Sequence, residues 1–182
     1  YPSFKIKFRV YLHNFTTMII GIGGVSRAGK TTLSARLKKR IKGKTIKILN
    51  QDDFVKKNKL PMIKNHVDWE HPDSIDWKAL EKAISTYRSE FDIVIVEGIF
   101  AFYHTKITKL YDWAFFVHIP KELFFNRKNK DLRWGKEPQW FIEHIWKSYL
   151  LYGRLPDFLK QVIWIDGSRK TPLEPLIQLV EA

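Results

Sequence analysis

One stretch of eight residues constrains the fold of this sequence more than any other. Residues 24–31 read Gly-Val-Ser-Arg-Ala-Gly-Lys-Thr and fit the pattern G-x-x-x-x-G-K-[ST]. An apolar run at 18–22 precedes the pattern, and Leu33, Leu37 and Ile41 recur after it at helical spacing. A buried strand, a glycine-rich loop and an amphipathic helix form the context in which this pattern binds phosphate. The stretch therefore predicts a phosphate-binding loop.

The residue types of this loop suit the chemistry of a polyphosphate. Glycines let the backbone curl until successive N–H groups point at phosphate oxygens, and the helix N-terminus adds a partial positive charge. We expect Lys30 to bridge the β- and γ-phosphates of ATP and the Thr31 hydroxyl to ligate Mg²⁺. The expected ATP contacts are Gly24, Ser26, Arg27, Ala28, Gly29, Lys30, Thr31 and Thr32. A purely structural glycine-rich turn is the alternative.

Four further apolar runs alternate with helical patterns. The predicted strands are 45–49, 93–96, 113–119 and 162–165, and the predicted helices are about 76–89, 121–131, 140–153 and 172–181. Each strand is apolar on both faces, which is typical of a parallel sheet covered by helices. The sequence therefore predicts an α/β, three-layer P-loop NTPase fold with a five-stranded parallel sheet.

Composition narrows the function classes less than the motif does. A chain of 182 residues with 45% hydrophobic content is long enough for one buried core, and the lack of cysteine excludes disulfides and zinc–thiolate sites. The net charge of +13 attracts polyanions, so nucleic acid, an anionic membrane or nucleotide phosphates would all qualify. No long apolar run or secretory signal is visible, so we expect a cytoplasmic protein without a membrane partner.

The first residues differ in pattern from the rest. We expect residues 1–17 to be an N-terminal extension, with the phosphate-loop domain spanning residues 18–182 and Met18 as a candidate natural start. Residues 4–10 alternate basic and apolar types, so a genuine edge strand is the alternative.

Carboxylates follow two of the predicted strands. Asp52 and Asp53 come directly after the second strand, and Glu97 ends the third. In open α/β sheets ligands bind at the carboxyl ends of the strands. We expect Asp52 to take the proton of an alcohol acceptor, and Glu97 to join the Mg²⁺ shell with Thr31 and Asp52. A turn or a helix cap is the alternative for both.

The sequence resembles the uridine kinase and nicotinamide riboside kinase group of P-loop small-molecule kinases. The motifs that carry the resemblance are 20–33, 51–54, 71–76 and 96–103. It implies an ATP- and Mg²⁺-dependent enzyme that phosphorylates the ribose 5′-hydroxyl of a small nucleoside, with no nucleic-acid partner. Residues 144–152 and 162–167 look more like nicotinamide riboside kinases, so that nucleoside, and with it NAD biosynthesis, is the leading expectation; uridine or cytidine is the alternative.

The resemblance also assigns roles around the acceptor. Asp52 matches the catalytic aspartate of the family. Trp69 and Glu70 match an aromatic residue and an acid that contact the ribose hydroxyls; the family usually has aspartate at the position of Glu70, so Asp68 is the alternative. His104, which follows the Glu97 motif, is a further candidate for the acceptor pocket.

A basic segment at 125–134 matches the helical lid of the family, which we expect at about 127–139. A lid that closes over the triphosphate brings cations to the transferring phosphoryl group and excludes water. Arg127 is the first candidate for this role and for a substrate contact, and Lys130 is the second. A solvated basic helix is the alternative.

The acceptor base and rival functions remain open from the sequence. Uridine kinases of this group carry a base-reading hairpin between a helix and the third strand, and residues 87–92 run into that strand with no room for one. Trp134, Trp140 and Phe141 are candidates to stack on a flat ring, or core residues. A phosphopantothenate-type or nucleoside-monophosphate kinase is a second enzyme hypothesis, and a nucleic-acid-binding or regulatory ATPase is the hypothesis from another class.

Overall fold

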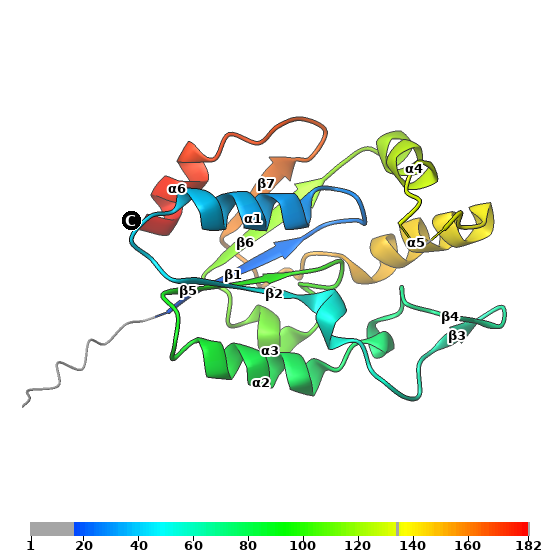
Figure 1. The fold of residues 1–182 in the computed structure, drawn as a ribbon, viewed down its shortest axis with the longest axis horizontal. Helices are drawn as coiled ribbons and strands as arrows, with labels where there is room; N and C mark the ends of the chain where they lie inside the picture. Colours follow the sequence, from blue (N-terminus) through cyan, green and yellow to red (C-terminus); the bar gives the residue numbers. More distant parts are fainter. Residues whose placement is uncertain (1–16, 134, 182) are drawn as a thin grey trace, which may run out of the picture.

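A parallel sheet organises the molecule in the computed structural model, which describes residues 17–133 and 135–181. Its strand order is β2-β5-β1-β6-β7 (Figure 1). The strands are β1 (Met18–Gly23), β2 (Ile46–Asn50), β5 (Ile93–Glu97), β6 (Trp113–His118) and β7 (Val162–Asp166). Each boundary lies within one residue of the prediction, and the predicted α/β fold with five parallel strands is confirmed. Residues 1–16 of the expected N-terminal extension (1–17), which include the alternative edge strand, lie outside the described ranges.

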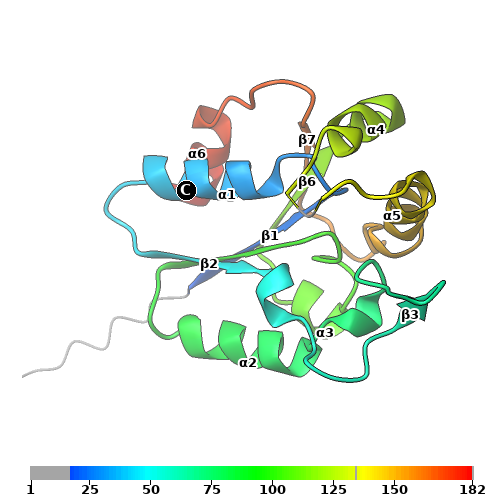
Figure 2. The same cartoon turned by 45° about the vertical axis from the view of Figure 1, so that its right-hand side comes forward.

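Helices form the outer two layers. The helices are α1 (Lys30–Arg40), α2 (Trp77–Tyr87), α3 (Thr105–Thr108), α4 (Lys121–Asn129), α5 (Gln139–Tyr152) and α6 (Glu174–Glu181). Figures 1 and 2 show α1 and α6 on one face of the sheet, α2 and α3 on the other, and α4 and α5 beyond the carboxyl ends of the strands. None of the helices within the described ranges combines the length and the apolar character that a membrane span needs.

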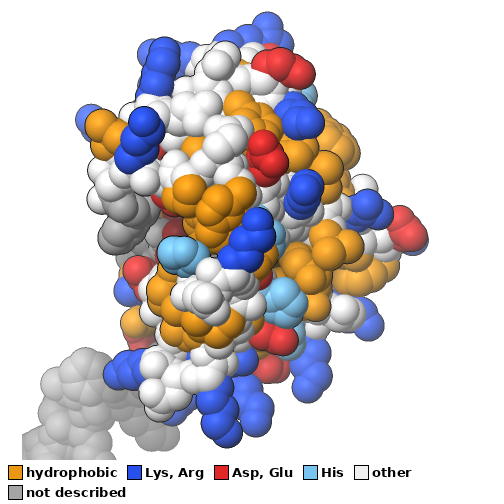
Figure 3. Space-filling view, turned by 90° about the vertical axis from the view of Figure 1, so that its right-hand side faces the viewer, with side chains coloured by type: hydrophobic (Ala, Val, Ile, Leu, Met, Phe, Trp, Pro, Cys, Tyr) orange, Lys and Arg blue, Asp and Glu red, His pale blue; other side chains and the backbone are white. Residues whose placement is uncertain are grey.

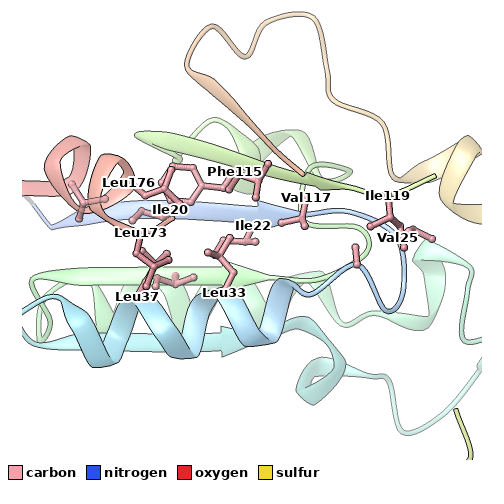
Figure 4. Close-up of a cluster of buried hydrophobic side chains, with 14 of the residues drawn as sticks. Ile20, Ile22, Val25, Leu33, Leu37, Phe115, Val117, Ile119, Leu173 and Leu176 are labelled. Atoms are coloured by element: carbon pink, nitrogen blue, oxygen red, sulfur yellow. The ribbon is translucent and has the colours of Figure 1, made fainter. Parts of the chain in front are cut away.

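The core divides into layers because side chains alternate along each strand. Ile20 and Ile22 of β1 face α1, where Leu33 and Leu37 lie one helical turn apart (Figure 4). Ile19, which precedes Ile20, belongs to a second cluster on the other face, with residues of α2. Both faces of the sheet are therefore apolar, as expected for buried parallel strands.

A short hairpin lies between β2 and α2 and was not anticipated. It pairs β3 (Met62–Ile63) with β4 (His66–Val67) in antiparallel register. Lys64 and Asn65, with φ of 44° and 64°, make the turn, which suits a two-residue hairpin connection. Strands of two residues are too short to show an alternating pattern, so the hairpin could not be predicted from the sequence. As expected, no hairpin lies between α2 and β5, but the chain does carry one earlier.

Two 3-10 helices complete the connections on this side. They are η1 (Gln51–Phe54), directly after β2, and η2 (Pro72–Ser74), directly before α2. The segment between them, with the hairpin, lies below α5 at the same end of the molecule as the carboxyl ends of the strands (Figure 2).

Candidate active site

The predicted phosphate loop connects β1 to α1. Gly24, Arg27 and Gly29 have φ of 139°, 63° and 107°, and Gly29 is the N-cap of α1. A side chain at position 24 would also collide with the Val117 carbonyl oxygen of β6, so glycine is required there for space as well as conformation. A loop of this kind at a helix N-terminus forms a concave anion-binding surface.

A cavity of about 850 Å³ opens along this loop. Its lining residues come from four parts of the chain. From the loop and α1 they are Ser26, Arg27, Ala28, Gly29, Lys30, Thr31, Thr32, Leu33 and Arg36; from the strand ends and the acceptor side Asn50, Asp52, Glu70, Glu97, Gly98, Ile99 and Val117; from the basic segment Arg127 and Arg133; and after β7 Gly167, Arg169, Lys170 and Thr171. The cavity thus brings together most of the residues that the sequence singled out.

The Thr31 hydroxyl and the Glu97 carboxylate meet at the floor of this cavity. Thr31 Oγ1 donates a hydrogen bond of 2.7 Å to Glu97 Oε1. Glu97 is buried at the end of β5, and burial raises the pKa of its carboxyl, an effect that the Thr31 hydrogen bond and Lys30 oppose. Hydroxyl and carboxylate oxygens are the hard ligands that Mg²⁺ prefers. The described residues hold no group of three or more His, Cys, Asp or Glu side chains that could bind a metal ion by themselves.

Lys30 lies among three carboxylates. Its Nζ donates to the Val25 carbonyl oxygen at 3.1 Å, across the loop. Burial lowers the pKa of Lys30, while the negative charges of Glu97, Asp52 and Glu70 raise it, in that order. The lysine therefore stands between the loop and the carboxylates, where a phosphate group would meet both.

Asp52 reaches the cavity from η1, and its neighbour Asp53 does not line it. The Asn50 side chain caps η1 by accepting from the Asp52 amide at 3.1 Å. The buried Gln51 side chain accepts from the Phe100 amide at 2.9 Å, which ties η1 to the loop after β5. These two contacts hold the short helix, so that the exposed Asp52 side chain faces the phosphate loop across the cavity.

Glu70 and Asp68, which were alternatives in the sequence, differ in their surroundings. Glu70 lines the cavity, and burial raises the pKa of its carboxyl to about 7 against the opposing charge of Lys128. Asp68 is buried behind it and accepts from His144 Nε2 at 2.7 Å and from the Glu70 amide at 3.1 Å. Asp68 therefore does not face the cavity.

Two other acceptor candidates lie outside the cavity lining. Trp69 is 48% exposed beside Glu70. His104 precedes α3, and its ring stacks on Trp77 of α2 with 5.1 Å between centroids and an angle of 16°. His104 Nδ1 is buried without a hydrogen-bond partner in the described part of the chain. The structure thus places His104 against the α2 layer.

The basic segment contributes one of the two expected residues and one that was not expected. Arg127 lines the cavity and its Nη1 donates to the Arg27 carbonyl oxygen at 3.0 Å. Lys130 is exposed at the end of α4 and does not line the cavity. Arg133 does, with its guanidinium held by Asp131 through hydrogen bonds of 2.9 and 2.7 Å. Sequence reasoning missed Arg133, although it belongs to the segment identified as the lid.

The loop after β7 also forms part of the wall and was not predicted. Gly167 approaches the phosphate loop so closely that a side chain would collide with the Ala28 carbonyl oxygen. Arg36 of α1 donates to the Thr171 carbonyl oxygen at 2.9 Å, which fixes the far side of the loop. The signal in the sequence was the position of this loop, at the carboxyl end of the fifth strand.

The aromatic candidates near the lid lie in different surroundings. The Trp140 ring contacts the hairpin, with Lys64 Nζ 4.8 Å from its centroid and the His66 ring at 5.5 Å. Phe141 packs partly against the core. Trp134 lies outside the described residues.

Comparisons with known proteins agree with this geometry. The model of the phosphoribulokinase / uridine kinase family matches residues 19–91. The chain is 27% identical over 172 residues to nicotinamide riboside kinase 1 of Homo sapiens, a match that covers 84% of this chain and 85% of that protein. It is 25% identical over 162 residues to the uridine kinase of Deinococcus deserti, covering 75% and 77%.

Solved structures share the fold. A sugar kinase from Janibacter superposes with a TM-score of 0.57 at 18% identity, covering 90% of this chain and 91% of that one. A possible uridine kinase from Bacillus stearothermophilus superposes with a TM-score of 0.53 at 16% identity, covering 82% and 89%. Given its phosphate loop, its fold and these relatives, the chain is a P-loop small-molecule kinase that is similar to members of the phosphoribulokinase / uridine kinase family.

Proposed function

We propose that this kinase transfers the γ-phosphoryl group of ATP to the ribose 5′-hydroxyl of a small nucleoside. The observation that carries the proposal is that Asp52 and Glu70 line the same cavity as the phosphate loop. A mechanical or regulatory ATPase needs only a positioned water at this point. Two carboxylates beside Lys30 instead suit an acceptor with several hydroxyl groups.

In this proposal Asp52 is the general base. It accepts the proton of the 5′-hydroxyl as that oxygen forms its bond to the γ-phosphorus and the bond from the γ-phosphorus to the ADP oxygen breaks. Lys30, Arg127 and Arg133 stabilise the charge on the phosphoryl oxygens. Apart from proton removal, catalysis is thus a matter of position and charge.

Thr31 and Glu97, and with them Asp52, would hold Mg²⁺ directly or through water. The ion would neutralise charge on the β- and γ-phosphates. Glu97 suits this role because its carboxylate is buried, and a cation would compensate the unfavourable burial of its charge.

Glu70 is the proposed partner of the ribose hydroxyls. We favour Glu70 over Asp68 for this role because Asp68 is buried, does not line the cavity, and already accepts at Oδ1 from His144 and from the Glu70 amide. Trp69, next to Glu70 and half exposed, offers a flat apolar surface to the acceptor.

We also propose that residues 18–182 form the kinase domain and that residues 127–139 act as its lid. This segment carries Arg127 and Arg133 into the cavity wall. Its closure over ATP would complete the cationic side of the site and exclude water.

Nicotinamide riboside is the first acceptor to test, because the alignments with two relatives named nicotinamide riboside kinase 1 cover 84% of this chain. Phosphorylation of this nucleoside would make the enzyme part of NAD biosynthesis. Uridine or cytidine is the second candidate. The hairpin of β3 and β4 favours it, because the backbone groups of a hairpin close to Glu70 can form hydrogen bonds with the edge of a base.

The test is ADP release from ATP and Mg²⁺ with nicotinamide riboside, uridine, cytidine and pantothenate in parallel. We expect one nucleoside to raise the rate far above the rate without acceptor, and mass spectrometry to show a monophosphate product. Stimulation by single-stranded DNA or RNA but by no small molecule would overturn the proposal.

A further inference from the structure

A single oxygen of Asp68 takes part in two hydrogen bonds, one with a residue two positions later and one with a residue of α5. Asp68 Oδ1 lies 2.7 Å from Nε2 of His144, on α5, and 3.1 Å from the amide nitrogen of Glu70. The carboxylate can only accept, so Nε2 of His144 carries the proton in this contact. Both side chains are largely buried, with exposures of 8% for Asp68 and 19% for His144. Burial makes such a charge-assisted bond stronger than its surface counterpart.

These bonds define the turn that presents Glu70 to the cavity. The Asp68 amide donates to the Pro61 carbonyl oxygen at 2.7 Å, which places Asp68 at the base of the hairpin. Its side chain then closes the turn by accepting from the Glu70 amide, two residues later. The backbone position of Glu70 therefore depends on where Asp68 Oδ1 is held.

His144 holds that oxygen from the opposite side. It lies one helical turn before Ser148, whose hydroxyl oxygen is 3.4 Å from His144 Nε2, and its ring lies 6.0 Å from that of Phe141. Figure 3 looks onto this end of the molecule, where histidine side chains lie among hydrophobic ones. His144 does not line the cavity, so its effect on the acceptor must pass through Asp68.

We propose that His144 is a positioning residue, which holds Asp68 and through it the turn that carries Glu70. The inference rests on the proposed function, because Glu70 contacts an acceptor only there. Since α5 follows the lid segment in the chain, the His144–Asp68 contact also links the lid side of the molecule to the acceptor carboxylate. Loss of His144 leaves Asp68 buried without its strongest partner, so the turn rearranges.

The kinetic test compares His144→Ala and His144→Gln with wild type, using the nucleoside that gives the highest turnover. His144→Ala should raise KM for the nucleoside about tenfold and leave KM for ATP within about twofold. Glutamine retains an N–H donor and should restore most of the loss. His118→Ala is the control, because His118 is an exposed histidine outside the cavity lining. Equal changes in both KM values, an unchanged nucleoside KM, or no rescue by glutamine would overturn the inference.

A second measurement needs no nucleoside. Amide hydrogen exchange of residues 68–71 should be at least about tenfold faster in His144→Ala than in wild type and unchanged in His118→Ala. Asp68→Asn keeps an acceptor oxygen and should show a smaller acceleration. Unchanged exchange in His144→Ala would overturn the positioning role. If wild type phosphorylated no nucleoside while exchange still changed as expected, the proposed function would fail and the His144–Asp68 contact would stand.

Discussion

Thr31 Oγ1 lies 2.7 Å from Glu97 Oε1, and this hydrogen bond joins the first turn of α1 to the end of β5. The two residues meet because β1 and β5 are adjacent and Ile22, just before the phosphate loop, is paired with Glu97. The contact brings together a hydroxyl and a carboxylate, and the positive charge of Lys30 acts on the same carboxylate.

The first prediction concerns this pair. Glu97→Gln keeps the shape of the side chain and removes its charge, so the Mg²⁺ concentration for half-maximal rate should rise about tenfold. Thr31→Ser, which retains the hydroxyl, should change this concentration less. Initial rates across a Mg²⁺ titration at fixed ATP measure the effect, and an unchanged titration in Glu97→Gln would remove Glu97 from the metal shell.

Adjacent aspartates provide a matched pair for the general base. Asp52→Asn should lower kcat with the preferred nucleoside by about 10²–10⁴-fold, because the acceptor hydroxyl loses its base. Asp53→Asn should stay within about twofold, since Asp53 is exposed and does not line the cavity. Steady-state kinetics of both variants decide the point, and near-normal turnover in Asp52→Asn would contradict the assigned role.

A second matched pair of variants tests which cationic side chain of the lid segment contributes to catalysis. Arg133→Ala should lower kcat about 10²-fold or more, because Arg133 lines the cavity with its guanidinium oriented by Asp131. Lys130→Ala should have a much smaller effect, because Lys130 is exposed at the end of α4. A larger loss in Lys130→Ala would mean that the lid turns over on closure and presents the other face.

Substitution of Gly24 tests the close packing of the phosphate loop, and substitution of Gly43 is the control for backbone strain alone. Both have positive φ, of 139° and 71°, but only at Gly24 would a side chain collide, with the Val117 carbonyl oxygen. Gly43→Ala should cost about 1–2 kcal/mol from strain alone. Gly24→Ala should cost more and should also abolish ATP binding. Chemical denaturation and nucleotide titration check the two effects, and equal stability losses would contradict the packing argument.

The carboxyl of Glu70 predicts a pH dependence of stability. Burial raises its pKa from 4.5 to about 7 in the folded protein. Between these values the unfolded chain releases the proton and the folded protein retains it, so the stabilisation present below pH 4.5 is lost as the pH rises towards 7. In Glu70→Gln this loss should be absent. Thermal unfolding without nucleotide at pH 5 and 7.5 should show Tm of wild type falling relative to the variant, and a constant difference would contradict the raised pKa.

Much of the fold was predictable because its signals are local. Buried parallel strands are apolar over several residues and amphipathic helices repeat their apolar positions, so both appear in the sequence regardless of their neighbours. Each strand of the sheet accordingly begins and ends within one residue of its predicted bounds. The hairpin of β3 and β4 was missed since its strands have two residues each.

The cavity was predictable where its residues follow strand ends. Lys30, Thr31, Asp52 and Glu97 stand at or just after such ends, and all four line it. That Arg133 lines the cavity and Lys130 does not was not predictable, because the face that a side chain presents depends on how α4 and the segment after it pack.

The sequence by itself determined the phosphate loop, the order of strands and helices, and the carboxylates that meet at the carboxyl edge of the sheet. Only the tertiary structure decided that Glu70 faces the cavity while Asp68 turns away from it. The reason is physical: the partner that holds Asp68 is His144, 76 positions later in the chain, and no local pattern encodes a contact between side chains so far apart.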